Sequence, residues 1–174
     1  EVLDVINDKG KLLQAMVAAN MPVPEFYICT SKTQVELAAQ KLGFDTEVIC
    51  VKPCIGNGSR GFRILDKQIS ESDRFWNQKP DSTYITWPNL LAVLGNNFEE
   101  LLVMEYLPGP EYTVDCLASK GKVLLALPRK RLQMRAGIST AGIFENNLDI
   151  LDQVHALVAH FGLDGPVGLQ FKAN

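Results

Sequence analysis

Residues 47–65 read EVICVKPCIGNGSRGFRIL, and this stretch decides what the rest of the chain is expected to be. The apolar β-formers in residues 48–51 predict a buried strand, and Lys52 stands at its end. A glycine-rich loop follows over residues 56–61, and residues 61–65 alternate as a second short strand. The stretch therefore predicts a β-hairpin with a glycine-rich tip and a lysine at its base.

The composition of this glycine loop suits it to bind phosphate. Glycine at its first, third and sixth positions lets backbone amides turn inward without a clash at Cβ, and inward amides bind phosphate oxygens. Lys52 adds a positive charge at the mouth of the same loop. An ordinary hairpin with a flexible tip is the alternative that these residues leave open. The loop residues that we expect to contact phosphate are Gly56, Gly58, Ser59, Arg60 and Gly61.

The glycine spacing also matches G-x-G-x-x-G, so other phosphate-binding loops have to be considered. A dinucleotide-binding turn opens a helix, but residues 62–65 alternate as a strand. A P-loop is excluded because no Gly-Lys-Ser/Thr follows the spacer. Protein kinases place their lysine on a later strand, whereas Lys52 precedes the glycines. A hairpin that folds over a nucleotide remains.

Length and charge limit the classes of protein that fit. The chain has 174 residues, 47% of them hydrophobic, which is enough for one sizeable core or two small lobes. The formal net charge is −3, so no basic field favours nucleic acid as a partner. No apolar run approaches the ~20 residues of a membrane span, so we expect no membrane partner either.

The cysteines and histidines do not suggest a metal centre. No two cysteines have C-x-x-C spacing, and their pattern is typical of small apolar residues in a reducing, cytoplasmic compartment. His155 and His160 are five residues apart on a predicted helix, so they do not share a face as an i, i+4 pair would. The four cysteines are Cys29, Cys50, Cys54 and Cys116.

The remaining segments predict further helices and strands. Asn7 is the expected N-cap of a first helix, and Ser31 opens a second helix through a capping box. The Pro-Gly-Pro segment at residues 108–110 is the expected hinge between two lobes. The expected helices span residues 8–20, 32–42, 67–78, 89–94 and 148–161, and the further strands span residues 25–29, 101–107, 111–117, 123–127 and 166–171.

Taken together, these motifs resemble those of the ATP-grasp superfamily. The resemblance covers nearly the whole chain and is strongest toward the large subunit of carbamoyl-phosphate synthase and its free-standing relatives. It rests on the order of the motifs along the chain, which is Lys52, the glycine loop, the strand ending in Glu105-Tyr106-Leu107, Gly109-x-Glu111 and a late Gln170.

The resemblance implies an α+β fold in which two α+β lobes hold ATP between them. A first helix and linker would span residues 1–24, a lid-bearing small lobe residues 25–105, and part of the C-terminal lobe residues 106–174. The domain that precedes these lobes in the superfamily, and the end of its C-terminal lobe, are expected to lie outside this sequence. We therefore expect an ATP-binding core that is inactive by itself.

The resemblance also implies roles for individual residues. Lys9 and Lys52 would reach the nucleotide, Lys52 at its phosphates, under a lid formed by the glycine loop. Glu111 would accept hydrogen bonds from the ribose hydroxyls, and Gln170 would bind a metal ion, Mg²⁺ or Mn²⁺. Each residue alone also fits an ordinary surface role, and only their joint order favours the functional one. The residues expected at the adenine edge are Glu105, Tyr106 and Leu107.

The basic run at residues 128–135 requires its own interpretation. It brings cations close to an expected loop of free amides at residues 136–142, which would suit a phosphate or an acyl phosphate. We expect Arg131 and Ser139 to be catalytic on this basis. The synthases have histidine where this chain has Ser139, which weakens the case for bicarbonate as substrate. A solvated charge run that binds nothing is the alternative.

The expected function is that of the ATP-binding core of an ATP-grasp ligase. ATP would activate a small carboxylate or bicarbonate as an acyl phosphate, which an amine-type nucleophile would then attack. A non-catalytic nucleotide-binding or regulatory module is the alternative, and a homodimer is compatible with either. A kinase-like phosphotransferase is disfavoured, because the chain has no His-Arg-Asp or Asp-Phe-Gly segment.

Overall fold

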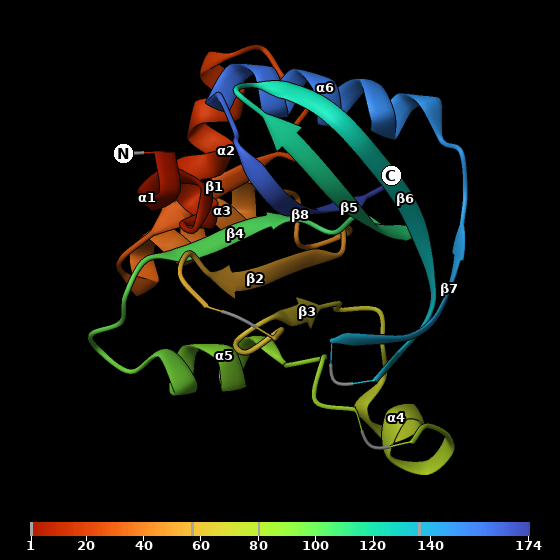
Figure 1. Cartoon of the computed structure of the whole chain (residues 1–174). Coiled ribbons are helices and arrows are strands. Elements are labelled where there is room, and N and C mark those ends of the chain that lie inside the picture. The colour runs from red at the N-terminus through yellow and green to blue at the C-terminus, as the bar shows by residue number, and fades with distance from the viewer. Residues whose placement is uncertain (1, 57, 80, 136) are drawn as a thin grey trace. The chain divides into compact units, whose positions relative to one another are not determined.

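The computed structural model describes residues 2–56, 58–79, 81–135 and 137–174 (Figure 1). Its helices and strands form two compact units, Leu3–Tyr106 and Leu107–Asn174, each with its own antiparallel sheet. The division lies next to the Pro-Gly-Pro segment that the sequence marks as a hinge. The predicted α+β class is confirmed.

The first unit is built on a four-stranded antiparallel sheet. The strands are β1 (Phe26–Cys29), β2 (Ile49–Pro53), β3 (Arg63–Leu65) and β4 (Leu101–Glu105). The helices in this part of the chain are α1 (Val2–Ile6), α2 (Lys9–Ala18), α3 (Lys32–Lys41), α4 (Glu71–Asn77) and α5 (Trp87–Leu94). The strand order is β1-β4-β2-β3, and the register places Lys52 of β2 beside Leu102 of β4.

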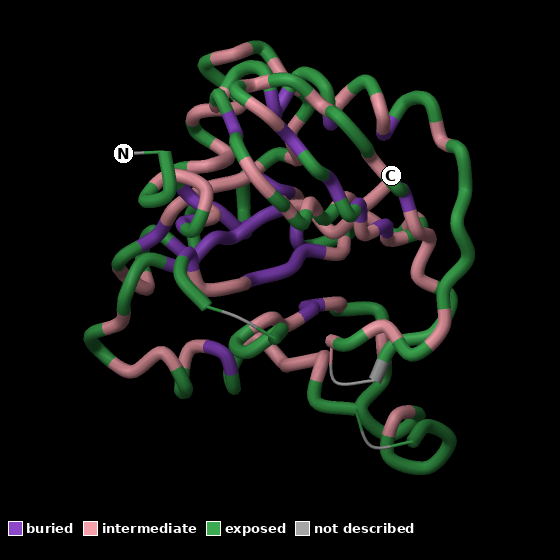
Figure 2. The backbone as a smooth tube through the Cα atoms, in the orientation of Figure 1, coloured by how far each residue is buried: buried purple, intermediate pink, exposed green. Residues whose placement is uncertain are grey.

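One face of this sheet packs on α3 and forms the main core of the unit. Ser31 caps α3 by accepting a hydrogen bond from the Gln34 amide, as the capping box predicts. Val35 of α3 meets Ile49 and Val51 of β2 in this core, and all three side chains are at most 1% exposed. Figure 2 shows the buried backbone concentrated in β2 and β4. Each such aliphatic side chain contributes about 1.5–3 kcal/mol by its burial.

The N-cap of α2 differs from the prediction. Asp8 is the cap, because its carboxylate accepts hydrogen bonds from the amides of Gly10 (2.9 Å) and Lys11 (3.1 Å). Asp8 is only 4% exposed, so its charge depends on these bonds. Asn7 instead follows the short helix α1. The predicted cap at Asn7 is wrong, and α2 also ends before the predicted residue 20.

The two helices between β3 and β4 have other bounds than predicted. α4 is shorter than the predicted helix at residues 67–78, because Ser70 caps it with a hydrogen bond to the Asp73 amide. α5 begins before the predicted residue 89, because Pro88 is accommodated in its first turn, where proline needs no amide hydrogen.

The second unit is a four-stranded antiparallel sheet with one helix, α6 (Leu148–Phe161), across one face (Figure 1). The strands are β5 (Glu111–Ser119), β6 (Lys122–Arg135), β7 (Ile138–Phe144) and β8 (Gly165–Lys172), in the order β7-β6-β5-β8. Asn147 caps α6, and Gly162 ends it with a φ of 59°. Within the described part of the chain, no helix is both long and apolar enough to cross a membrane. The residues of β5 that are buried on the α6 side are Tyr112, Val114, Cys116 and Ala118.

The basic run forms part of a strand that continues past the predicted end at residue 127. β6 continues through it to Arg135, and most of the expected loop at residues 136–142 pairs with β6 as β7. Ala136 lies outside the described residues. A strand tolerates these cations because carboxylates pair with three of them. The pairs are Arg129–Asp115 at 3.9 Å, Lys130–Glu145 at 4.0 Å and Arg131–Glu111 at 3.1 Å.

Candidate functional site

Lys52 lies on the face of the first sheet that is turned away from α3. Alternation along β2 places it with Cys50, because Ile49 and Val51 face the α3 core. Burial lowers the pKa of Lys52, the Cys50 thiol opposes this shift, and the nearby Lys9 ammonium adds to it. A cation in this position is destabilised unless an anion accompanies it.

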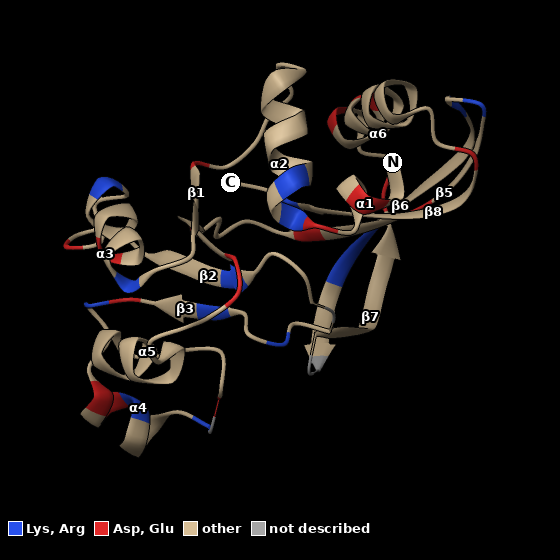
Figure 3. Cartoon of the chain, turned by 90° about the vertical axis from the view of Figure 1, so that its left-hand side faces the viewer, with Lys and Arg blue, Asp and Glu red and all other residues tan. Residues whose placement is uncertain are grey.

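Among the residues that the structure describes, no carboxylate forms an ion pair with Lys52. None of the ion pairs there includes Lys52, although its side chain is half-buried. Figure 3 shows a second basic segment at the start of α2. The end of β2 is therefore a site of uncompensated positive charge, which is typical of anion binding.

Lys9 ties α2 to the first residues of the glycine loop. Its backbone amide donates to the Cys54 carbonyl at 2.9 Å. Its ammonium donates to the carbonyls of Gly56 at 2.7 Å and Cys54 at 3.4 Å. The expected contact of Lys9 with a nucleotide stays a prediction, and the structure adds that this lysine fixes the base of the loop beside Lys52.

The glycine loop forms an exposed turn between β2 and β3. Gly58, Ser59 and Gly61 have φ values of 61°, 58° and 74°, in the left-handed region that favours glycine. Gly61 has a second constraint, because a Cβ there would lie 2.6 Å from Cδ of Pro53. Asn57 lies outside the described residues. The exposed residues of the loop are Gly56, Gly58, Ser59, Arg60 and Gly61.

An apolar surface adjoins Lys52 on the same sheet face. Its buried residues are Cys50, Ile64 and Met104, and its partly buried residues are Phe26, Val48, Phe62, Tyr84 and Tyr106. Aromatic and sulfur-containing side chains of this kind suit a planar heteroaromatic ring. The first unit therefore places an apolar surface beside the uncompensated charge of Lys52, as a nucleotide requires.

The three residues expected at the adenine edge have different environments. Tyr106 belongs to the apolar surface, and its amide donates to the Val48 carbonyl at 3.3 Å. The carboxylate of Glu105 accepts a hydrogen bond of 2.8 Å from the Glu25 amide, which ties the start of β1 to β4. Leu107 is the first residue of the second unit. Of the three, Tyr106 is the residue that the structure assigns to the apolar surface.

In the second unit, Glu111, Arg131 and Lys172 form an ionic cluster on the sheet face that α6 leaves uncovered. Arg131 Nη1 donates to Glu111 Oε2 at 3.1 Å, and Lys172 Nζ donates to Oε1 at 3.3 Å. The Arg131 side chain is only 9% exposed. The sequence suggested Glu111 and Arg131 separately and missed Lys172. Lys172 could have been found from its spacing, because it lies two residues after Gln170 and therefore on the same face of β8.

The two residues predicted to be catalytic lie on the ribbon of β6 and β7. Arg131 Nη2 donates to the Gly137 carbonyl at 2.6 Å, and Ser139 Oγ donates to the Ala141 carbonyl at 3.2 Å. Among the described residues, no histidine or carboxylate forms a hydrogen bond with Ser139 that could activate it as a nucleophile. The catalytic roles of both residues stay predictions.

Gln170 lies opposite Thr113 on the same uncovered sheet face. Its amide oxygen can supply one ligand to Mg²⁺, which also requires carboxylates, phosphates or water. The carboxylates of β5 are already paired, Glu111 with two cations and Asp115 with Arg129. The described residues therefore do not complete a Mg²⁺ site.

A group of possible ligands that the sequence did not suggest lies at the start of α2. Oxygen and sulfur atoms of Asp8, Cys54 and Glu100 lie within 4.8 Å of one another. Asp8 is engaged as a helix cap. Burial raises the pKa of the Cys54 thiol, and the negative charges of Asp8 and Glu100 raise it further. A metal ion needs the thiolate. The group is therefore explained by packing.

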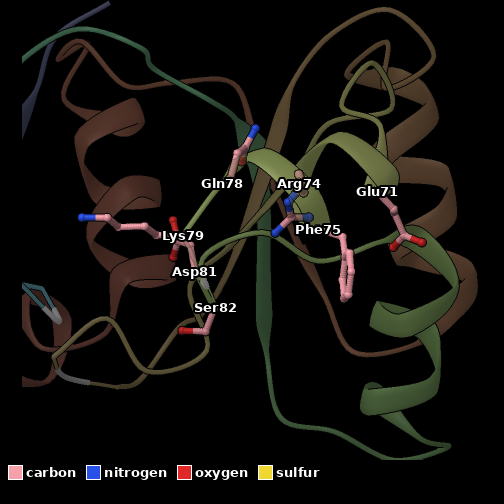
Figure 4. A pocket seen from close by; sticks show the side chains of 7 residues that line it. All are labelled: Glu71, Arg74, Phe75, Gln78, Lys79, Asp81 and Ser82. Atoms are coloured by element: carbon pink, nitrogen blue, oxygen red, sulfur yellow. The ribbon is translucent and has the colours of Figure 1, made fainter.

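An open hollow of about 730 Å³ lies beside α4 (Figure 4). Charges of both signs line it, and the Arg74 guanidinium stacks over the Tyr84 ring at 4.8 Å. Its lining residues are Glu71, Arg74, Phe75, Gln78, Lys79, Asp81 and Ser82. None of the residues predicted for the functional site belongs to it, so no role is assigned to this hollow.

Comparison with known proteins identifies the fold. Residues 97–174, less than half of the chain, match the family model described as ATP-grasp in the biosynthetic pathway with Ter operon. D-alanyl-alanine synthetase A from Vibrio cholerae is similar with a TM-score of 0.63 and 17% identity, over 95% of this chain and 51% of that one. N5-carboxyaminoimidazole ribonucleotide synthetase, solved with ADP, is similar with a TM-score of 0.63 and 16% identity, over 97% and 41%. The chain has the predicted ATP-grasp fold.

One curated relative is much longer than this chain. The uncharacterized protein y4rH of Sinorhizobium fredii is 24% identical over 125 residues, which are 64% of this chain and 26% of the relative. The chain thus spans about a quarter of that relative and about half or less of the two solved structures. At these identities the solved structures establish the fold alone. Neither of the two solved structures is a carbamoyl-phosphate synthase, so that finer resemblance stays a prediction.

Proposed function

We propose that this chain is the ATP-binding core of a ligase that activates a carboxylate. The observation that carries the proposal is the position of Lys52, a half-buried cation that no described carboxylate neutralises, at the base of an exposed glycine loop. Phosphates would supply the anion that this charge lacks. The adjoining apolar surface would accept the adenine ring. The ATP-grasp fold supports the same assignment.

The proposed reaction proceeds through an acyl phosphate. A carboxylate oxygen of the substrate attacks the γ-phosphorus of ATP, and ADP leaves with the electrons of the broken bond. An amine then attacks the acyl carbon and displaces phosphate. Lys52 and the amides of the glycine loop would hold the γ-phosphoryl group and stabilise its developing charge. We favour a small carboxylic acid over bicarbonate, because Ser139 stands where the synthases have histidine.

Mg²⁺ or Mn²⁺ is proposed as a companion of the triphosphate, with Gln170 as one ligand. The ion would neutralise phosphate charge. No step of the proposed reaction is assigned to it, because the described residues do not complete its coordination.

Isothermal titration calorimetry with ATP tests the binding step. Lys52→Met should weaken ATP binding by about tenfold or more, since a charge-assisted contact contributes about 1.5–3 kcal/mol. Lys122→Met is the matched control, because Lys122 is an exposed lysine at the start of β6 and should have no effect. Equal affinity of the Lys52→Met variant and the wild type would refute a phosphate site at this position.

Turnover has to be tested with the full-length protein. The protein is incubated with ATP, pools of small carboxylic acids, and hydroxylamine as a nucleophile that traps acyl phosphates as hydroxamates. Release of ADP together with hydroxamate supports a ligase. ATP binding without either product supports the alternative of a non-catalytic nucleotide-binding or regulatory module.

A further inference from the structure

Two cations hold Glu111 from opposite sides of its strand. Arg131 belongs to β6 and Lys172 to β8, and these two strands flank β5. Arg131 donates to one carboxylate oxygen at 3.1 Å and Lys172 to the other at 3.3 Å. The carboxylate is therefore restrained at both oxygens, each from a different neighbouring strand.

Arg131 directs two of its three nitrogens at groups of the protein. Nη1 binds Glu111, Nη2 binds the Gly137 carbonyl at 2.6 Å, and the buried Nε has no partner among the described groups. With a side chain only 9% exposed, the guanidinium has little surface to offer to an external anion. Its geometry suits a residue that acts through Glu111.

Glu111 keeps the capacity to bind two further donors. A carboxylate has about four lone-pair positions, two on each oxygen, and the two cations occupy one on each. Its side chain remains 30% exposed. Two neighbouring hydroxyl groups, such as the 2′ and 3′ hydroxyls of ribose, would supply one donor for each oxygen. An ionised carboxylate accepts and cannot donate, so it would select for a diol.

We propose that Lys172 and Arg131 are positioning residues that fix Glu111 to recognise a ribose diol. This inference rests on the proposed binding of ATP. The selection for ribose then depends on Lys172, a residue that does not itself need to touch the nucleotide. Loss of Lys172 would free one carboxylate oxygen, so that the side chain can rotate and the two acceptors no longer match the diol.

The test compares ATP with 2′,3′-dideoxy-ATP by calorimetry in wild-type protein and three variants. Lys172→Met removes the positioning charge, Lys172→Arg keeps it, and Lys122→Met is an exposed control on the same sheet. Arg131 is left intact because its burial makes a folding defect the expected result of its loss. The wild type should prefer ATP by about tenfold or more. Lys172→Met should reduce this preference to less than about threefold, while Lys172→Arg and Lys122→Met retain it.

The preference between the two nucleotides separates positioning from a merely structural role. If Lys172→Met weakens the binding of both nucleotides equally and keeps the preference for ATP, Lys172 does not position Glu111 and the inference is overturned. If the wild type binds both nucleotides equally well, the ribose role of Glu111 fails while the proposed binding of ATP stands. If the wild type binds neither, the proposed function fails and this inference with it.

Discussion

At the scale of single residues, Lys52 should make ATP affinity depend on pH. Burial lowers its pKa from the ordinary 10.5, so its ammonium loses the proton at a lower pH than an exposed lysine does. Affinity for ATP should fall as the pH rises through this lowered pKa, by about tenfold or more once Lys52 is neutral. Calorimetry across this pH range should show the step in wild type and in Lys122→Met, but not in Lys52→Met. A step that persists in Lys52→Met would assign it to another group.

The same shift in the pKa of Lys52 should also affect the stability of the protein without ligand. The folded-state pKa of Lys52 lies below the unfolded one, so its charge opposes folding at every pH below the folded value. This cost disappears as the pH rises toward 10.5. Lys52→Met should therefore keep or raise the free energy of unfolding at pH 7, measured by denaturant titration. A clear loss of stability would show that the ammonium is already paired in the free protein.

The four cysteines should be unreactive in the folded protein. None of the four forms a disulfide, and all are at most 4% exposed. Burial raises the pKa of Cys29 to about 11, and it also raises the pKa values of Cys54 and Cys116. Because the thiolate is the reactive form, alkylation of Cys29 at pH 8 should be about 100-fold slower than that of an exposed thiol. Mass spectrometry of native and unfolded samples checks this, and rapid labelling of any cysteine in the native sample would contradict it.

Residue roles could be predicted from the sequence where they depend on local spacing. The position of Lys52 at the end of a strand, and the face that it shares with Cys50, follow from alternation. The ionic cluster could not be predicted, because Glu111 meets Arg131 across 20 residues and Lys172 across 61. Such contacts depend on the register of three strands, which the sequence does not reveal without a structure.

At the scale of elements, the same distinction explains β6. Strands with apolar alternation, such as β5, are predicted from the sequence, whereas the predicted strand at residues 123–127 stops before the basic run. The strand is possible because carboxylates on β5 and after β7 pair with the cations. The N-cap of α2 shows a similar limit, since Asn7 and Asp8 are both good caps and only the buried position of Asp8 decides between them.

The glycine loop should become protected when ATP binds. Its described residues are exposed, and one backbone hydrogen bond, from the Phe62 amide to the Ser59 carbonyl at 3.1 Å, closes the turn. Amides of this kind should exchange rapidly in the free protein. Bound phosphates would accept hydrogen bonds from them and slow exchange by about tenfold or more.

Hydrogen exchange with and without ATP and Mg²⁺ measures this change. Peptides from α3, which packs in the core of the same unit, serve as the internal control and should not change. Equal exchange of the glycine loop in both states would mean that it is an ordinary turn, and the phosphate site would then lie elsewhere.

At the scale of the whole molecule, the α+β class and the ATP-grasp fold could be predicted from the sequence. Each motif alone is weak evidence, but the order of the motifs along the chain is specific. The sequence treats residues 1–24 as a first helix and linker, and in the structure α2 belongs to the first unit. The reason is a pair of contacts that span more than forty residues, from Lys9 to Cys54 and Gly56. Interactions over that separation are not visible in a local pattern.

ATP with Mg²⁺ should stabilise the chain by mass action. A ligand that binds only the folded state adds RT ln(1 + [L]/Kd), which is about 2.7 kcal/mol at a hundredfold excess over Kd. For a chain of this length, that free energy should raise Tm by about 5–10 °C in a calorimetric scan.

Fragments of the ligand should isolate the contribution of the phosphate site. Tripolyphosphate has no ribose or base, so without Mg²⁺ it tests only the proposed phosphate site at Lys52. Adenosine lacks phosphates and should not depend on Lys52. Lys52→Met should therefore reduce the rise in Tm with tripolyphosphate and leave the smaller rise with adenosine unchanged. Wild type and Lys52→Met differ only at residue 52. A rise in Tm with tripolyphosphate that is equally large in both proteins would therefore place the phosphate site away from the glycine loop.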